Sequence, residues 1–153
     1  MSGITLHPTE NYLTTACLDG SWHFLDINAG ACLKKILGPT GSDGYEYSSC
    51  SFHPDGLILG TGTSTGVLKV WDIREQQNVA NCAEHTAAIR SVVFSENGYL
   101  VATASDDGQV KIWDLRKLIC TKSLEGKLIT VGLLFSLIYF SHSGTKWSVC
   151  CVI

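Results

Sequence analysis

A short segment ending in Trp-Asp recurs in this chain, and the spacing of its copies constrains the fold more than any other feature. Trp71-Asp72 and Trp113-Asp114 lie 42 residues apart, and Leu25-Asp26 stands 46 residues before Trp71-Asp72. Self-similarity at a period of about 40–45 residues is typical of small four-stranded sheets that each need a neighbour to bury their faces. The repeat therefore predicts an all-β chain of three such antiparallel units.

The third copy has the clearest strand pattern. Residues 94–115 read FSENGYLVATASDDGQVKIWDL, in which 99–104 ends in small residues and 109–114 alternates polar and apolar residues. Asp107-Gly108 lies between these two segments and supplies the positive φ that a tight turn requires. The pattern predicts a β-hairpin at the centre of the unit.

The same order of strand and turn signals divides the chain into four parts. We expect a degenerate first unit over 1–37, a second over 45–83, a third over 84–124 and an atypical apolar tail over 125–153. The glycine-rich stretch 38–44 is expected to be an inter-unit loop. The predicted strands are 4–6, 12–16, 21–26 and 32–36, then 47–52, 57–61, 67–72 and 78–82, and finally 89–94, 99–104, 109–114 and 120–124.

Composition excludes several classes of function. The 153 residues are 45% hydrophobic and 16% charged, with a formal net charge of -3. This balance allows a sizeable core, and it argues against direct nucleic-acid binding because no Lys/Arg stripe is present to follow phosphates. The seven cysteines form no CxxC pair. We interpret them as reduced thiols that fill core positions in a reducing compartment.

The residues do not indicate catalysis, a metal site or a cofactor. His85 and Asp107 with a nearby hydroxyl could suggest a hydrolase triad, but no serine lies on a G-x-S-x-G turn. The other histidines lack ligand spacing, and the Asp106-Asp107 pair implies no third oxygen ligand. The loop 38–44 lacks the lysine of a phosphate-binding loop.

Neither end of the chain carries a clear targeting signal. Residues 1–13 have neither a basic nor an apolar region of a signal peptide, and no segment reaches the length of a membrane span. The apolar residues of 126–153 lack the alternation of the units, so we expect them to come from an alternative transcript end. Cys150-Cys151-Val152-Ile153 fits a prenylation box only nominally.

The Trp-Asp endings at this period resemble those of WD-repeat β-propeller blades. Within that family, the similarity is greatest to the C-terminal domain of the U-box ubiquitin ligases of the splicing complex, in the segments FHPDGLILGTG, VWDIREQQNVAN and FSENGYLVATASDDGQVKIWDLRKL. The resemblance covers about 4–118. It implies an incomplete propeller of three four-stranded blades, because closed rings use about 4–8 blades.

The resemblance also implies a structural tetrad in the third blade. His85, Thr103, Asp107 and Trp113 match the family pattern of a hydrogen-bonded network that satisfies buried polar groups. The second unit has Thr65 where Asp107 stands, with Pro39 or a neighbour in place of the histidine. The first unit keeps Asp19 and lacks both the histidine and the tryptophan. We expect partial networks there and the greatest rigidity in the third blade.

The resemblance alone indicates the function, because the residues themselves indicate no reactive group. It implies a nuclear, partner-binding piece of a ligase that acts in splicing and DNA repair, with splicing-complex proteins and ubiquitylation substrates as partners and no membrane. In that family the U-box carries the activity and a coiled coil forms a homo-tetramer, and neither is expected in this chain. Arg74 and Arg116 follow the Trp-Asp pairs in a W-D-x-R form that resembles substrate receptors of cullin-based ligases. A generic WD-repeat scaffold or such a receptor is the alternative.

Overall fold

Three four-stranded antiparallel sheets make up the described part of the chain. The computed structural model describes residues 1–37 and 45–125, and the expectations about loop 38–44 and the tail beyond Glu125 fall outside these residues. The first sheet contains β1 (Gly3–Leu6), β2 (Tyr12–Ala16), β3 (Ser21–Asp26) and β4 (Ala31–Leu37). The second contains β5 (Tyr47–Phe52), β6 (Ile58–Thr63), β7 (Leu68–Asp72) and β8 (Gln77–Cys82). The third contains β9 (Ile89–Phe94), β10 (Leu100–Ser105), β11 (Gln109–Asp114) and β12 (Ile119–Glu125).

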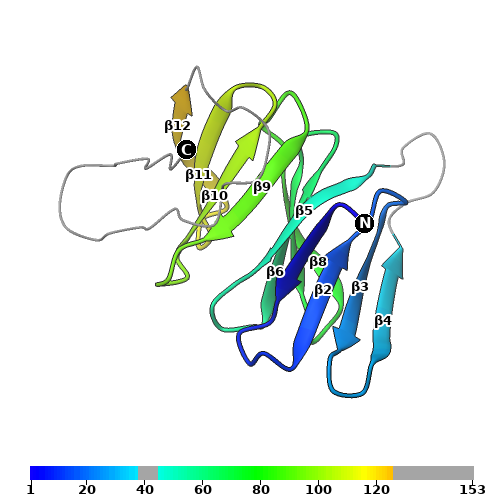
Figure 1. The fold of residues 1–153 in the computed structure, drawn as a ribbon. Helices are drawn as coiled ribbons and strands as arrows, with labels where there is room; N and C mark the ends of the chain where they lie inside the picture. Colours follow the sequence, from blue (N-terminus) through cyan, green and yellow to red (C-terminus); the bar gives the residue numbers. More distant parts are fainter. Residues whose placement is uncertain (38–44, 126–153) are drawn as a thin grey trace, which may run out of the picture.

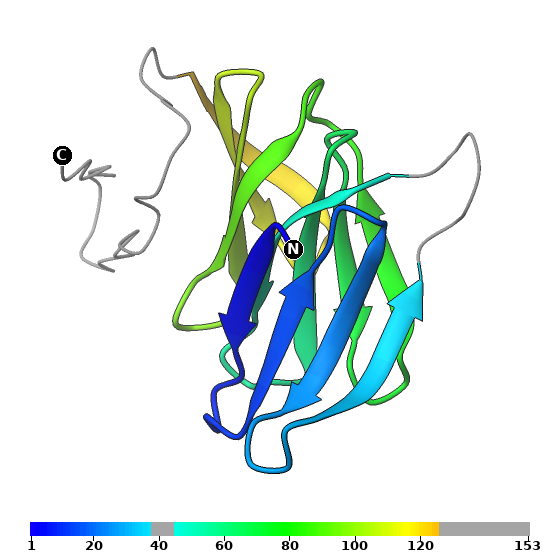
Figure 2. The ribbon, with the colours of Figure 1, turned by 45° about the vertical axis from the view of Figure 1, so that its right-hand side comes forward.

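Each sheet is a simple meander in which strands pair in sequence order. The sheets lie side by side like the blades of a fan, with the second between the first and the third (Figures 1 and 2). We call them blades one, two and three. This confirms the predicted all-β, incomplete propeller architecture, and every predicted strand is present with ends displaced by at most two residues.

The Trp-Asp position has the same backbone irregularity in every blade. The pairing of the third strand with the fourth shifts register between Phe24 and Leu25, between Val70 and Trp71, and between Ile112 and Trp113. A β-bulge of this kind bends the strand and changes the direction of the following side chain. The degenerate first copy therefore keeps the backbone geometry of the repeat although Leu25 replaces the tryptophan.

Two apolar clusters lie between neighbouring blades. Between blades one and two, Ala16 and Trp22 pack with four buried residues of the second sheet, Tyr47, Phe52, Leu59 and Trp71. Between blades two and three, the cluster contains Leu68, Val70, Cys82, Ile89, Val92, Phe94, Val101 and Trp113. The cores thus form between sheets and not within them, as expected of units that bury their faces on neighbours.

No described residue of another blade covers the outer face of blade one. Ile4 and Leu6 lie on β1 with 60% and 52% of their surfaces exposed. Their pairing places them on the same face as Leu25, opposite the face that packs on blade two. On blades two and three, the positions of Leu6 and Leu25 are held by Phe52 with Trp71 and by Phe94 with Trp113, all buried.

The described cysteines contribute to the core only in part. The five described cysteines are free thiols, of which Cys82 is buried and Cys32 exposed, so only part of the set fills the core. Burial raises the pKa of the Cys50 thiol to about 12. In residues 1–37 and 45–125, no helix is long and apolar enough to cross a membrane.

Candidate functional site

The four residues predicted to form the tetrad of blade three lie within hydrogen-bonding distance of one another. The Trp113 indole N–H donates to the Thr103 hydroxyl at 2.9 Å. Thr103 Oγ1 lies 2.8 Å from His85 Nε2, and His85 Nδ1 lies 2.7 Å from an Asp107 carboxylate oxygen. Since a carboxylate only accepts, Nδ1 carries the proton and Nε2 accepts from the threonine hydroxyl. The chain of bonds satisfies every polar group in it.

Asp107 connects this network to the turn between β10 and β11. One carboxylate oxygen accepts the Gln109 backbone N–H at 2.9 Å, and the other accepts the Thr86 backbone N–H at 3.1 Å in addition to the imidazole. The His85 and Asp107 side chains are 0% and 7% exposed. Burial opposes ionisation, but the hydrogen bonds from His85 and the two N–H groups outweigh it and lower the pKa of Asp107.

Nothing in this arrangement provides a reactive centre. Thr103 uses its hydroxyl for Trp113 and His85, and the whole group is enclosed between sheets. Asp106, which with Asp107 raised the question of a cation site, receives two hydrogen bonds from the Arg90 guanidinium. Within the described ranges, no group of three or more metal-ligating side chains comes together.

Blades two and one keep parts of the same network. In blade two, Trp71 donates to Thr61 at 2.9 Å, while Thr65 bonds to Thr63 and does not reach this pair. In blade one, Asp19 accepts from the backbone and hydroxyl of Ser21. Position 39 lies outside the described residues. These contacts agree with the expectation that both networks are partial.

The two W-D-x-R arginines differ in their surroundings. The Arg116 guanidinium bonds to the Asp114 carboxylate at 3.3 Å and lies over the Tyr99 ring, 4.9 Å from its centroid. The side-chain hydrogen bond from Arg116 is the main cause of the lowered pKa of Asp114. Arg74 is exposed, and its side chain has no partner in the part of the chain that the structure describes. Arg74 is therefore the freer of the two to bind another molecule.

Two histidines in the first turns of blades one and two join neighbouring blades. His7 Nε2 donates to the Gly56 carbonyl at 3.1 Å, and His53 Nε2 donates to the Gly98 carbonyl at 2.8 Å. Each ring also packs edge-on against a phenylalanine of the next blade, Phe52 or Phe94. The recurrence of His-Pro in two copies was the sequence signal for these contacts. Sequence alone did not reveal the partner, which lies 45 or 49 residues away.

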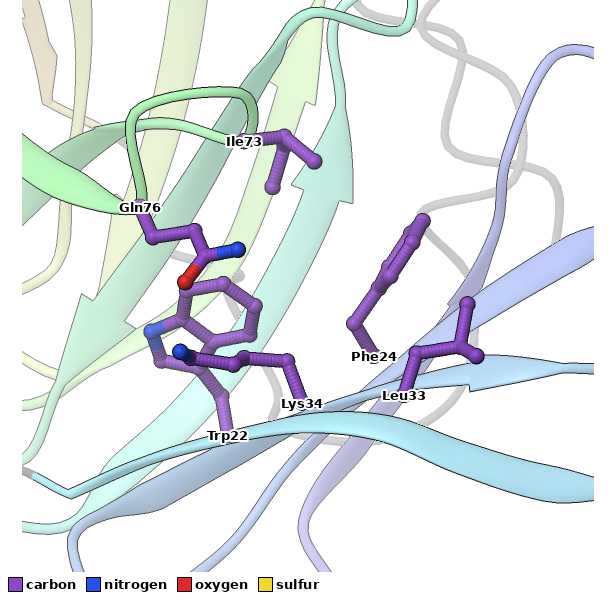
Figure 3. A pocket seen from close by; sticks show the side chains of 6 residues that line it. All are labelled: Trp22, Phe24, Leu33, Lys34, Ile73 and Gln76. Carbon is purple, nitrogen blue, oxygen red and sulfur yellow. The ribbon is translucent and has the colours of Figure 1, made fainter.

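A pocket that the sequence did not predict opens between blades one and two. Its volume is about 190 Å³, and its walls come from β3, β4 and the β7–β8 turn (Figure 3). Four of the lining side chains are apolar and two are polar: Trp22, Phe24, Leu33, Ile73, Lys34 and Gln76. Trp22 is 1% exposed, and its indole nitrogen is buried with no hydrogen-bond partner.

The stacked meanders, the Trp-Asp positions and the enclosed tetrad define a WD-repeat propeller segment. The family model described as "WD domain, G-beta repeat" matches residues 30–72 and 76–114, and the chain belongs to this family. Each matched segment begins beside the last strand of one blade and ends at the Asp of the next Trp-Asp pair. Each sequence repeat therefore includes the last strand of one blade and the first three strands of the next, so that it links the two blades covalently.

Among individual proteins, the chain is similar in sequence to pre-mRNA-processing factor 19 of several organisms. The chain is 50% identical over 93 residues to "Pre-mRNA-processing factor 19 homolog 2" of Arabidopsis thaliana, covering 61% of this chain and 17% of that protein. It is 50% identical over 96 residues to "Pre-mRNA-processing factor 19" of Oryza sativa subsp. japonica, covering 63% and 18%. The Bos taurus protein of the same name is 47% identical over 94 residues, covering 61% and 18%. The chain thus spans less than a fifth of the length of these relatives.

A solved structure supports the fold independently. The chain entitled "Structure of U3-55K" superposes with a TM-score of 0.75 at 20% sequence identity, covering 82% of this chain and 39% of that one. At this level of identity the match concerns the fold alone.

Proposed function

We propose that this chain is a protein-interaction scaffold that serves the substrate- and partner-binding WD-repeat domain of a U-box ubiquitin ligase in pre-mRNA splicing and DNA repair. The observation that carries the proposal is the identity of 50% over 93 residues with a pre-mRNA-processing factor. Fold alone would not carry it, since one fold supports many functions.

The chemistry of the described residues supports a binding role over a catalytic one. The conspicuous polar groups His85, Thr103 and Asp107 satisfy one another inside blade three. Polar groups committed in this way stabilise a scaffold, and they leave the exposed turns as the surface for partners. On this proposal, ubiquitin transfer depends on a U-box elsewhere in the parent protein, which would assemble as a tetramer through its coiled coil. The nucleus is the proposed compartment, because splicing takes place there.

Co-purification from nuclear extract tests the proposal. The tagged 153-residue chain is expected to retain splicing-complex proteins, and a variant with Trp113→Ala, which loses the anchor of blade three, is expected to retain them less. Retention of no splicing protein by the folded wild-type chain would overturn the proposed function.

The exposed Arg74 favours one alternative, a substrate receptor of a cullin-based ligase. Changing Arg74 and Arg116 to alanine separates the two functions, because a receptor would lose binding to the purified cullin adaptor. The scaffold function predicts that splicing proteins co-purify with this double variant as they do with the wild type. Arg116→Ala alone is the control for the loss of its contacts with Asp114 and Tyr99.

A further inference from the structure

The outer face of blade three is buried, although no described blade packs against it. Strand pairing places Ala102 and Ile112 side by side on this face, opposite the face of Val101 and Trp113, which pack on blade two. Ala102 and Ile112 are each 4% exposed, and neither apolar cluster of the described residues includes them. Within 1–37 and 45–125, blade three is the last of the fan (Figures 1 and 2). An alanine is too short to cover the neighbouring isoleucine, so the sheet itself does not explain this burial.

The outer face of blade one, at the other end of the fan, is exposed by comparison. Ile4 and Leu6 on β1 are 60% and 52% exposed. Leu13 and Leu25 pair on the two central strands of that face and also remain partly exposed. Ile112 stands on a central strand in the same way, yet it is almost fully buried. The two end faces therefore differ, although neither has a described blade beyond it.

The equivalent face of blade two shows what such a face receives. Gly60 and Val70 hold the positions that Ala102 and Ile112 hold in blade three. The ring of Phe94 lies over Gly60, because a Cβ at Gly60 would be 2.9 Å from it, and Val70 is 3% exposed in the same cluster. Small residues on the second strand thus leave space for large apolar side chains of the next element. Blade three keeps a small residue at this position, and its face requires an apolar occupant of the same kind.

The chain that follows β12 has the composition and length of such an occupant. In residues 128–140, which begin shortly after the last residue of β12, ten of thirteen residues are apolar or aromatic and none is charged. Thirteen extended residues span about 40 Å, whereas the four strands of a blade are about 14 Å across, so the segment is long enough to reach β9 from β12. The other segment outside the described ranges, 38–44, connects β4 to β5 and so joins blades one and two.

We infer that residues 128–140 dock on the outer face of blade three of the same chain, with large apolar side chains over Ala102 and Ala104 in the place that Phe94 takes over Gly60. Burial of apolar surface on both sides drives the contact, and no charge of the segment has to be desolvated. The segment then takes the place of a following blade. The outer face of blade one remains the end of the described fan that is open to another molecule. The inference is independent of the scaffold function, because no partner enters into it.

Photo-cross-linking in the full 153-residue chain tests this contact. The photoreactive residue p-benzoylphenylalanine replaces Ser91, which pairs with Ala104 on β9, the strand of this face farthest from β12. Ile4, on the first strand of the open face of blade one, is the matched control site. Position 91 is expected to cross-link to peptides from 128–140, and position 4 is not. An equal mixture of ¹⁴N- and ¹⁵N-labelled chains identifies links between copies, because those links combine both labels.

Two triple variants separate docking from the proximity that a tether alone provides. Serine at residues 133–135 keeps the length of the tail but removes three large apolar side chains, and it is expected to lower the cross-link yield from position 91 at least about tenfold. Serine at Trp147, Val149 and Val152 removes three apolar residues outside the segment and is expected to leave the yield unchanged. Neither variant alters a blade residue. The inference is overturned if position 91 links to no residue of 128–140, if the links combine both labels, or if position 4 or the 133–135 variant gives the same yield.

Discussion

His53 of blade two donates a hydrogen bond from Nε2 to the carbonyl of Gly98 in blade three, at 2.8 Å. The contact depends on the absence of a side chain at position 98, because a Cβ there would lie only 2.4 Å from Nε2 of the His53 ring. Gly98 also has a φ of 72°, which disfavours other residues. The same three conditions hold for His7 and Gly56 at the other boundary. The first turns of blades one and two are therefore the points where the next blade is fixed.

The first prediction concerns this contact. Gly98→Ala is expected to lower the free energy of unfolding by about 1–3 kcal/mol, through backbone strain and through collision with the His53 ring. Urea denaturation followed by tryptophan fluorescence measures the change. In the double variant with His53→Ala the collision is absent, so the two effects are expected to sum to more than the measured total. Strict additivity would show that the ring and position 98 do not interact.

Thr103 and Thr61 allow a matched comparison of the tetrad with its partial copy. Thr103→Val leaves the Trp113 indole N–H and His85 Nε2 without a partner, whereas Thr61→Val leaves only the Trp71 indole N–H unpaired. Each unpaired buried group costs about 1–3 kcal/mol, so the first variant is expected to lose more stability than the second. Equal losses in chemical denaturation would mean that the imidazole adds nothing to the network.

The tetrad should also make stability depend on pH in the acidic range. The pKa of Asp107 in the folded chain is below its usual value of 3.8, so its contribution is fully present above that value and is lost as pH falls through the folded pKa. The difference in unfolding free energy between the wild type and Asp107→Asn is therefore expected to shrink from about pH 4 downward. Denaturation curves at several pH values measure it. A difference that stays constant or grows on acidification would contradict the assignment.

The open face of blade one is expected to cause self-association. Ile4 and Leu6 are exposed on an edge strand whose face is equivalent to covered faces in blades two and three. Leu6→Lys should reduce association in sedimentation or light-scattering measurements and change stability by less than about 0.5 kcal/mol. Val79→Lys, at 54% exposure on another sheet, is the control and should have little effect. A wild-type chain that remains a monomer at high concentration would contradict this prediction.

Local sequence patterns were sufficient to predict the strands, whereas the tetrad followed from the resemblance to WD-repeat blades. Alternation and turn residues act over short distances, so hairpins such as 99–114 could be predicted to within one residue. The period then aligned the copies, which showed that Asp19 keeps the residue type of Asp107 and that Thr65 departs from it.

Contacts across blades could not be predicted in the same way. The role of His53 depends on an empty space at Gly98 in another blade, and no local pattern encodes that distance. The Trp22 ring, which lines the pocket, stands at a different strand position from Trp71 and Trp113. Its missing acceptor becomes evident only when the neighbouring strand is placed beside it. Such features result from packing, and packing is decided by residues that are far apart in sequence.

The histidine contact runs in one direction along the chain and cannot be extended at either end. In blade three the histidine position holds Ser95, and in blade one the glycine position holds Glu10, which adopts the same left-handed backbone at φ 61°. A further blade placed against blade one would find a side chain where the imidazole has to lie. The two interior junctions, His7 with Gly56 and His53 with Gly98, are therefore chemically distinct from the outer edges of blades one and three. Copies of this chain that associate through exposed apolar surface would do so without the geometric register that makes neighbouring blades a propeller.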